Sequence, residues 1–508
     1  MEKRPPVVGI FGHIDHGKST LLDYIRKTNV VEKEAGRRHA KASYGLAEAG
    51  GITQHISAYE VSRKNADGKE NRITFIDTPG HEAFANVRAR GANVADIAVL
   101  VVSAEDGVKP QTIEVYKHIE ESETPYIVAI TKIDKPTADI DRTKQNLAEN
   151  GIYVEGYGGN VSCVPVSGKT GLGMDELLDI IALQADILEL KGNPEELGSG
   201  IIIESRLDPK RGITAVGIIK NGTVRKGTFA GAAGTWAPLR LILDAENKQT
   251  EELSFSSPAQ MVGWSELPRV GSEFKTFLKK EETTEYANEQ KSINNKQSAK
   301  IQTLAEGVRV LPIILKADTA GSLEVVENEI TKLSRERIIP KVILSSVGSI
   351  SENDIKSAMA NVGAVILGFN AKTDSGAAAL ALRSGVVIST FNIIYELTEK
   401  VSKLLEERES RIEVEEISGS AKVIRLFSIS KGKQVLGARV ISGRIARGFD
   451  IKVMRRDSEI GRGKIKELQQ AKVAANEVLE GAEFGAMIES KTEIALGDVL
   501  EAVTLVTK

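Results

Sequence analysis

The stretch Val7-Val-Gly-Ile-Phe-Gly-His-Ile-Asp-His-Gly-Lys-Ser19 decides the fold of the first domain. An apolar run, Val7–Phe11, stands directly before the pattern Gly-x-x-x-x-Gly-Lys-Ser, and a helix-like segment follows. Glycines in this pattern let backbone N–H groups close around phosphates, and the N-terminus of the following helix adds a favourable dipole. In such a loop Lys18 would reach the β- and γ-phosphates, and the Ser19 hydroxyl would bind Mg²⁺. We therefore expect a phosphate-binding loop made of Gly12, His13, Ile14, Asp15, His16, Gly17, Lys18, Ser19 and Thr20.

A second loop, Thr131-Lys-Ile-Asp134, follows the apolar run Tyr126–Ile130 and is placed to select the base. The carboxylate of Asp134 can accept from the ring N–H and the exocyclic amine of guanine, a pair of donors that adenine lacks. The stem of Lys132 would pack on the base. Thr131 stands where Asn is usual, and its shorter side chain should weaken binding by about 1 kcal/mol. The matching later loop is Ser167-Gly168-Lys169, whose backbone N–H groups would meet the guanine carbonyl.

A third loop, Asp77-Thr-Pro-Gly80, follows the apolar run Ile73–Ile76 and would face the γ-phosphate. Asp77 would hold Mg²⁺ through water, and the Gly80 N–H would bind the γ-phosphate. The next residue, His81, could position the attacking water. Thr53, in Gly50-Gly-Ile-Thr-Gln-His55, would complete the Mg²⁺ and γ-phosphate shell when its loop orders. The sequence thus predicts a GTP- and Mg²⁺-binding domain.

The pattern of strand-like and helix-like segments changes several times along the chain. Strand-like runs alternate with helix-like stretches at the start, which favours a parallel sheet covered by helices. Short β-rich runs with Gly turns then indicate a barrel, and α/β alternation returns later. A stripe of apolar residues from Ile394 to Leu405 indicates a long helix. We expect a multidomain α/β and β protein: a P-loop GTPase domain (1–190), a β-barrel (198–278), a polar, helix-compatible linker (279–305), a small α/β/α layer domain (306–392), a connecting helix (393–412) and a C-terminal β-barrel (413–508).

The composition is that of a globular, multidomain chain. It has 508 residues, 41% apolar and 27% charged, which excludes fibrous and wholly disordered classes. The net charge is −3, so a basic surface could only be local. A single cysteine, Cys163, allows no internal disulfide, and no apolar run is long enough to span a membrane. We expect a cytoplasmic protein without a membrane partner.

A weak repeat links the two expected barrels. Asn221-Gly-Thr-Val-Arg-Lys-Gly227 and Ser442-Gly-Arg-Ile-Ala-Arg-Gly448 share the pattern x-Gly-x-(Val/Ile)-x-x-Gly, and both lie between β-rich runs. Two unrelated hairpins with similar turns would give the same pattern. We favour two related barrels.

Several motifs together resemble one family closely, bacterial translation initiation factor two. They are Gly-His-Ile-Asp-His-Gly-Lys, Gly-Gly-Ile-Thr-Gln-His-Ile, Asp77-Thr-Pro-Gly-His-Glu-Ala-Phe84 and Arg88-Ala-Arg-Gly-Ala92. The resemblance extends through Glu204–Asp208, Lys316–Glu324 and Leu496–Glu501 to essentially the whole chain. The GTPase sequence begins almost at Met1, without the family's long N-terminal region, and the loop before Thr53 is expanded by a basic stretch at 37–47.

The resemblance implies a ribosome-stimulated GTPase with defined partners. Such a protein brings formylmethionyl initiator tRNA to the small (30S) ribosomal subunit, promotes joining of the large (50S) subunit, acts with other initiation factors and works as a monomer. It also implies that the last barrel holds the acylated tRNA end. The residues that the resemblance assigns there are Arg439, Arg455, Lys472, Glu483, Phe484, Gly485 and Glu489.

The last barrel departs from the family at these positions. Glu483-Phe484-Gly485 replaces Glu-Cys-Gly, Glu489-Ser-Lys491 replaces Glu-Asn-Phe, and Lys472 alone remains of an Arg-Arg-Phe-Lys-Asp-Asp loop. A methionyl side chain needs an apolar slot, which Phe484 could wall and Lys491 could not unless its stem packs. The stretch 418–475 has 14 Lys or Arg and 4 Asp or Glu, a net charge of +10, whereas 476–508 has a net charge of −5. We therefore expect strongly salt-dependent tRNA binding with a modest preference for the formylated end.

Two alternatives remain open. Another translational GTPase, such as a selenocysteine-specific elongation factor, would require C-terminal winged-helix domains, which the sequence does not suggest. A non-enzymatic ribosome- or tRNA-binding factor with a weakened nucleotide site would explain Thr131 but not the intact Lys18, Ser19, Asp77, His81 and Asp134.

Overall fold

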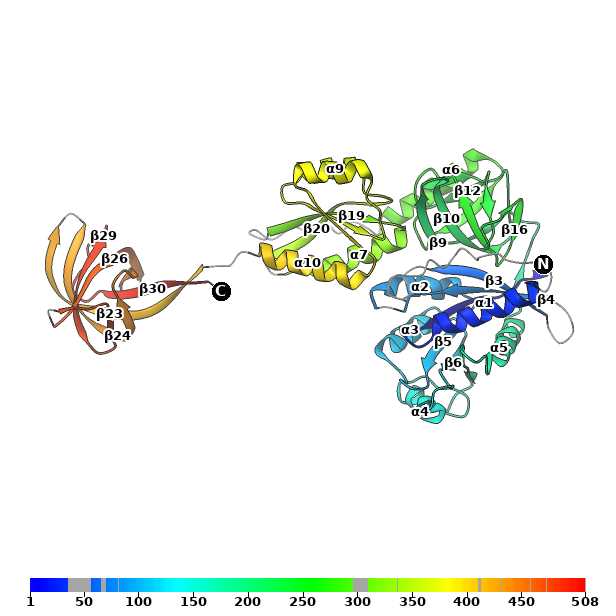
Figure 1. Ribbon diagram of the computed structural model, residues 1–508, viewed down its shortest axis with the longest axis horizontal. Helices are drawn as coiled ribbons and strands as arrows, with labels where there is room; N and C mark the ends of the chain where they lie inside the picture. The colour runs from blue at the N-terminus through cyan, green and yellow to red at the C-terminus, as the bar shows by residue number, and fades with distance from the viewer. Residues whose placement is uncertain are drawn as a thin grey trace. The chain divides into compact units, whose positions relative to one another are not determined.

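The computed structural model describes two compact units, Met1–Arg408 and Glu409–Lys508 (Figure 1). The first unit holds a P-loop sheet, a β-barrel and a smaller α/β layer domain; the second is a β-barrel. The mixed α/β and β fold class expected from the sequence is therefore confirmed. The described residues are 1–34, 56–64, 70–80, 82–295, 309–335, 337–409, 413–430, 432–456, 458–471 and 473–507.

The N-terminal sheet has the strand order β3-β4-β2-β5-β6-β7. All neighbours from β4 to β7 are parallel, and β3 is antiparallel to β4. Helices α1 and α5 cover one face and α2, α3 and α4 the other, so the central strands β2 and β5 are buried throughout. The bounds are β2 Val7–Gly12, α1 Lys18–Glu34, β3 Ser57–Lys64, β4 Glu70–Asp77, α2 Ala85–Val94, β5 Ile97–Ser103, α3 Pro110–Glu121, β6 Tyr126–Thr131, α4 Ile140–Glu149, β7 Cys163–Pro165 and α5 Met174–Ile187.

The first barrel is antiparallel, with the order β13-β12-β18-β9-β10-β17-β14-β15 and a separate β11–β16 pair. Helix α6 (Lys280–Asn295) lies at the start of the expected linker and packs on this barrel. The Lys280 ammonium lies 4.4 Å from the centre of the Trp236 ring, and the Tyr286 and Phe277 rings are 5.4 Å apart. The strands are β9 Ser199–Asp208, β10 Gly212–Asn221, β11 Thr223–Arg225, β12 Phe229–Ala232, β13 Thr235–Pro238, β14 Ile242–Leu243, β15 Gln249–Thr250, β16 Glu252–Ser254, β17 Pro258–Val262 and β18 Glu273–Phe277.

The α/β layer domain is a parallel sheet in the order β20-β19-β21-β22. Its long helix α10 (Ile394–Arg408) buries Ile394, Leu397, Val401, Leu404 and Leu405, the stripe that the periodicity indicated. The other elements are β19 Arg309–Ala317, α7 Ala320–Lys332, β20 Ile338–Val347, α8 Glu352–Ala360, β21 Val365–Phe369, α9 Ser375–Ser384 and β22 Val387–Phe391.

The C-terminal unit is a closed antiparallel barrel, because β23 pairs with both β30 and β24 at the two ends of the order β23-β30-β25-β26-β29-β24. Its apolar interior comes from alternate residues of these strands. The bounds are β23 Glu413–Ser430, β24 Lys433–Ala446, β25 Asp450–Arg455, β26 Ser458–Gln470, β27 Val473–Ala474, β28 Glu477–Leu479, β29 Glu483–Ser490 and β30 Val499–Thr507.

The repeated sequence pattern has the same local geometry in both barrels. The first glycines, Gly222 and Gly443, have φ of 74° and 67°, and the second, Gly227 and Gly448, both have φ of 88°. A side chain at either first glycine would clash with a backbone carbonyl oxygen 2.3–2.4 Å away. Each second glycine donates its N–H towards the neighbouring antiparallel strand, to Leu239 O at 2.9 Å and Ile465 O at 2.8 Å respectively. This bond-for-bond match supports two related barrels over two unrelated hairpins.

Candidate guanine-nucleotide site

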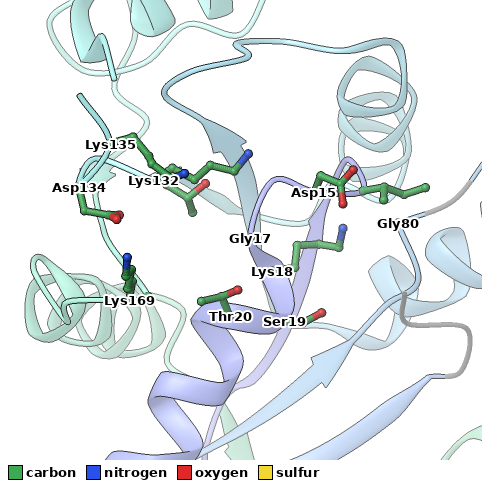
Figure 2. A pocket seen from close by; sticks show the side chains of 13 residues that line it. Asp15, Gly17, Lys18, Ser19, Thr20, Gly80, Lys132, Asp134, Lys135 and Lys169 are labelled. Carbon is green, nitrogen blue, oxygen red and sulfur yellow. The ribbon is translucent and has the colours of Figure 1, made fainter. Parts of the chain in front are cut away.

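A cavity of about 380 Å³ opens at the carboxyl edge of the N-terminal sheet, where β2 and β6 end. Figure 2 shows Lys18, Ser19 and Asp15 near Gly80 at one end of this cavity, and Asp134 and Lys169 at the other. Residues from loops that the sequence places far apart therefore line one space. The lining residues are Ile14, Asp15, Gly17, Lys18, Ser19, Thr20, Gly80, Thr131, Lys132, Asp134, Lys135, Gly168 and Lys169.

The phosphate-binding loop depends on residues with positive φ. Gly12 and Gly17 have φ of 146° and 86°, and Asp15 has φ of 57°. A Cβ at Gly12 would lie 2.4 Å from Val101 O on β5, so this position excludes any side chain. Because the loop turns at these residues, α1 begins at Lys18 with its N-terminus at the cavity. Unpaired N–H groups at a helix N-terminus favour an anion there.

Lys18 is buried and is held inside the loop. Its Nζ donates to Gly12 O at 2.8 Å and His13 O at 2.7 Å. Burial lowers the pKa of Lys18 to about 8, although the nearby Asp77 carboxylate acts in the opposite direction. A bound phosphate would favour the charged ammonium, so the site is electrostatically prepared for an anion.

The rings of two histidines of the phosphate-binding loop pack edge to face. The rings of His13 and His16 are 4.9 Å apart with an interplanar angle of 67°. His16 is 1% exposed, and burial lowers its pKa to about 3, so its ring is neutral at physiological pH. Its Nδ1 lies 3.4 Å from Val101 O. His16 therefore packs the loop against β5 and is not among the residues that line the cavity.

The base-selecting loop is held in an ionised, oriented form. The Ser167 hydroxyl donates to Asp134 Oδ1 at 2.8 Å, and this bond lowers the pKa of the Asp134 carboxyl. Lys132 has φ of 61°, and its Nζ lies 3.2 Å from Asp106 Oδ2, which fixes the side chain beside the cavity. Gly168 packs so closely on α1 that a Cβ there would lie 2.9 Å from the Thr20 carbonyl. The carboxylate, the lysine stem and the later loop are thus brought together.

Thr131 has a role that the sequence reasoning missed. Its hydroxyl is buried and donates to His16 O at 2.5 Å, and it also lies 3.3 Å from Val102 O. Thr131 therefore ties the base-selecting loop to the phosphate-binding loop through its backbone. The signal was available in the residue type, since a hydroxyl at the end of a buried strand needs an acceptor.

The third loop lies against the phosphate end. Asp77 is the last residue of β4 and is 8% exposed. Its carboxylate lies close enough to Lys18 to favour the charged ammonium and so raise the pKa of Lys18. A Cβ at Gly80 would lie 2.3 Å from Lys18 Nζ and 3.0 Å from Ile14 N, so Gly80 packs directly against the phosphate-binding loop. His81 and Thr53, like the basic stretch at 37–47, lie outside the described residues.

The residues assigned to the acylated tRNA end lie in more than one place on the C-terminal barrel, although Arg439 and Glu483 pair with each other. Glu483 and Gly485 point outward on β29, whereas Phe484 is 4% exposed and belongs to the barrel core. The expectation that Phe484 walls a surface slot is therefore wrong, because successive side chains of a strand alternate between faces. Arg455, on β25, makes two hydrogen bonds of 2.8 Å to the buried Asp498 and is not beside the others. Lys472 lies outside the described residues, and Lys491 is exposed beyond the end of β29.

An apolar surface that sequence reasoning missed lies on the outer face of the barrel beside Gly485. Gly437 of β24 pairs with Gly485, and Arg425 of β23 pairs with Gly437, so two glycines lie opposite each other on adjacent strands. The Phe427 ring is 64% exposed and packs over Gly437, 3.3 Å from where a Cβ would stand. Val435 lies on the same face of β24. No local pattern reveals this surface, because it depends on the pairing register of three strands.

Part of the positive charge of residues 418–475 is paired within the barrel. Six basic side chains of this stretch form ion pairs, whereas Lys422 and Arg425 form no ion pair with a described residue. Two of the six acidic partners lie within the stretch itself, so the pairs offset only part of its excess positive charge. The pairs are Arg439–Glu483, Arg444–Glu477, Arg455–Asp498, Arg462–Glu459, Lys464–Asp450 and Lys466–Glu489.

The fold and the cavity define a guanine-nucleotide-binding P-loop domain of the translation-factor class. Residues 3–186 match the elongation factor Tu GTP binding domain, 198–277 match elongation factor G domain 2, and 283–402 match translation-initiation factor 2. The chain belongs to the translation initiation factor IF-2 family. It is 42% identical to "Translation initiation factor IF-2" of Nitratiruptor sp., in an alignment that covers 99% of this chain and 59% of that protein. It is 39% identical to the protein of the same name from Caldanaerobacter subterraneus, in an alignment that covers 99% of this chain and 70% of that protein.

The chain spans about three-fifths of the length of several of these relatives, for example 61% of the Aquifex aeolicus protein, to which it is 40% identical. Among solved structures, GDP-bound aIF5B from Aeropyrum pernix aligns with 99% of this chain and 92% of its own, with 25% identity and a TM-score of 0.47. In the part of the chain that the structure describes, no helix is long and apolar enough to cross a membrane.

Proposed function

We propose that this chain is a translation initiation GTPase that binds GTP and GDP through the cavity at the sheet edge. The observation that carries the proposal is the Asp134 carboxylate, held by Ser167 at one end of a cavity whose other end is the phosphate-binding loop. An ionised, oriented carboxylate accepts both guanine donors, and the loop N–H groups and Lys18 bind the phosphates. In competition binding, GTP and GDP should displace a fluorescent guanine nucleotide, and ATP should not; equal affinity for ATP would refute the proposal.

The same site fits Mg²⁺ as the nucleotide's partner ion. The Ser19 hydroxyl lies in the first turn of α1 at the cavity, and the buried Asp77 carboxylate lies at the end of β4 near Lys18. Hydroxyl, carboxylate and phosphate oxygens are the hard ligands that Mg²⁺ prefers, and Asp77 would act through water. When bound, the ion would neutralise charge on the β- and γ-phosphates. Thr53 would join these ligands from its own loop.

Hydrolysis is expected to be slow in the isolated protein and fast on the ribosome. Phosphoryl transfer depends mainly on positioning, and His81, next to Gly80 in the chain, is the candidate for orienting the attacking water. His81→Ala should leave GTP affinity nearly unchanged and remove most of the ribosome-stimulated turnover. An unchanged stimulated kcat would reject this role. Absence of any turnover in the unmodified protein would instead favour a non-enzymatic ribosome- or tRNA-binding factor.

The proposed partners are formylmethionyl initiator tRNA, the 30S and 50S subunits and other initiation factors, with the chain acting as a cytoplasmic monomer. We assign the acylated end to the outer face at Gly437 and Gly485. The exposed Phe427 ring over Gly437 and the neighbouring Val435 offer apolar contacts for an unbranched thioether side chain, and Arg425 beside them is available for a phosphate or carbonyl. The formyl group suits this apolar setting because it removes the amino charge.

The charges of this barrel determine how tRNA binding should depend on salt. Because basic residues of 418–475 such as Lys422 and Arg425 have no acidic partner among the described residues, the log–log salt slope should correspond to several phosphate contacts at about −0.9 each. Phe427→Ala should abolish the preference for the formylated end, whereas Phe427→Leu should retain part of it. Titration of formylated and unformylated initiator tRNA at several salt concentrations measures both quantities. Equal affinity for the formylated and unformylated tRNA would refute the assignment of this surface, and a flat salt response would refute the phosphate contacts.

A further inference from the structure

A buried arginine of α2 bridges the third loop and helix α3. Arg88 is 1% exposed, and its guanidinium donates to Pro79 O at 3.3 Å and to Glu114 Oε1 at 2.5 Å. It also lies 3.5 Å from Glu82 O, so it contacts carbonyls on both sides of Gly80. A planar fork of donors can serve several acceptors at once, which an ammonium on a flexible stem cannot do in the same geometry.

The bond to Pro79 O fixes the direction of the next amide. The carbonyl of Pro79 and the N–H of Gly80 belong to one planar trans peptide unit and point in opposite directions. With the carbonyl turned to Arg88, the Gly80 N–H points away from Arg88. Gly80 itself lies against the phosphate-binding loop, since a Cβ there would be 2.3 Å from Lys18 Nζ and 3.0 Å from Ile14 N.

Helix α3 gives this arrangement a rigid base. Its residue Gln111 accepts from Ile14 N of the phosphate-binding loop at 3.5 Å, and Glu114, on the same helical face three residues later, holds Arg88. One helix thus braces both loops that meet at the phosphate end of the cavity. Glu114 is 28% exposed and compensates the charge of a fully buried guanidinium.

We propose that Arg88, held by Glu114, is a positioning residue that aims the Gly80 N–H at the γ-phosphate. Neither side chain touches the nucleotide. This inference rests on the proposed function, because it concerns the part of the site that tells GTP from GDP. An amide that meets only the γ-phosphate adds to the affinity for GTP and not to that for GDP.

The test compares the affinities for GDP and for a non-hydrolysable GTP analogue, both with Mg²⁺. Glu114→Ala, which leaves the guanidinium without its carboxylate, should lower affinity for the GTP analogue about tenfold and leave GDP affinity unchanged. Glu114→Gln keeps an acceptor and should give a smaller loss. Arg90→Gln is the matched control, because Arg90 lies on the same helix but pairs with Glu324 of α7 at 2.6 Å; its GTP-to-GDP ratio should equal that of the unmodified protein.

Arg88→Lys provides a second variant, with circular dichroism to check its fold. Equal losses for both nucleotides in the Glu114 variants would mean that the pair is only structural and would overturn the inference, as would an unchanged affinity for the GTP analogue in Glu114→Ala. A failure of the unmodified protein to bind guanine nucleotides would instead overturn the proposed function.

Discussion

Replacing Thr131 by Val would remove the bond between the base-selecting loop and the phosphate-binding loop while nearly preserving volume. The hydroxyl donates to the buried His16 carbonyl at 2.5 Å, so the variant loses one hydrogen bond and leaves an acceptor without that donor. Such a change costs about 1–3 kcal/mol. If about half of this cost falls on the loop conformation that binds phosphate, nucleotide affinity should fall about two- to twelvefold. GTP and GDP should be affected equally, because the bond supports loop backbone that both would use.

Fluorescence titration with labelled GDP and GTP measures this loss, and thermal unfolding measures the accompanying loss of stability. Thr131→Ser, which keeps the hydroxyl, is the control and should bind nearly as well as the unmodified protein. Affinity of Thr131→Val within twofold of the unmodified value would refute the reasoning. A loss confined to GTP would also contradict it, since the hydroxyl does not face the γ-phosphate loop.

Three further perturbations test the nucleotide site. Asp134→Asn should shift base preference toward xanthine, because an amide offers a donor where the carboxylate accepted; competition with xanthosine and guanosine diphosphates measures it. Gly80→Ala should weaken binding of the GTP analogue more than of GDP, since its methyl group would crowd Ile14 N at 3.0 Å and shift the Gly80 amide that meets the γ-phosphate; equal weakening in the same titrations would contradict this. His16→Gln should reduce the loss of stability in acid. The folded-state pKa of His16, about 3, is below the unfolded value of 6.5, so the folded protein binds fewer protons and loses stability as pH falls from 6.5 toward 3. At pH 5 the protonation of His16 on unfolding lowers the free energy of unfolding by about 2 kcal/mol, which urea titrations measure. If His16→Gln shows the same pH dependence of stability as the unmodified protein, the low pKa assigned to His16 is wrong.

Much of the fold could be predicted from local pattern. The apolar runs at Val7–Phe11 and Ile97–Val102 correspond to fully buried parallel strands, and the stripe on α10 corresponds to a buried helix face. The packing of α6 could not be predicted, because a polar helix contacts the barrel mainly through Tyr286, Ala287 and the cation over Trp236. Composition alone made that segment resemble a linker.

The two candidate sites differ in how far sequence could locate them. Each nucleotide-site loop follows its own strand of a parallel sheet, so the motif order alone indicated that Lys18, Gly80 and Asp134 would meet. The candidate surface on the last barrel requires Gly437 and Gly485 to lie opposite each other, which only strand register determines. The burial of Phe484 could have been predicted from the sequence. A charged residue such as Glu483 faces solvent on a strand, so the next residue, Phe484, faces the barrel interior.

The matching turns of the two barrels have a consequence for folding. Chains that contain two copies of one β-scaffold risk pairing a strand of one copy with the sheet of the other, and such misassembly is a typical failure of multidomain proteins. Here the α/β layer domain separates the copies in the sequence, and the strands differ in length, from Gly212–Asn221 in one barrel to Lys433–Ala446 in the other. During synthesis the first barrel can close before the second is made, so the order of the copies along the chain itself protects against strand exchange.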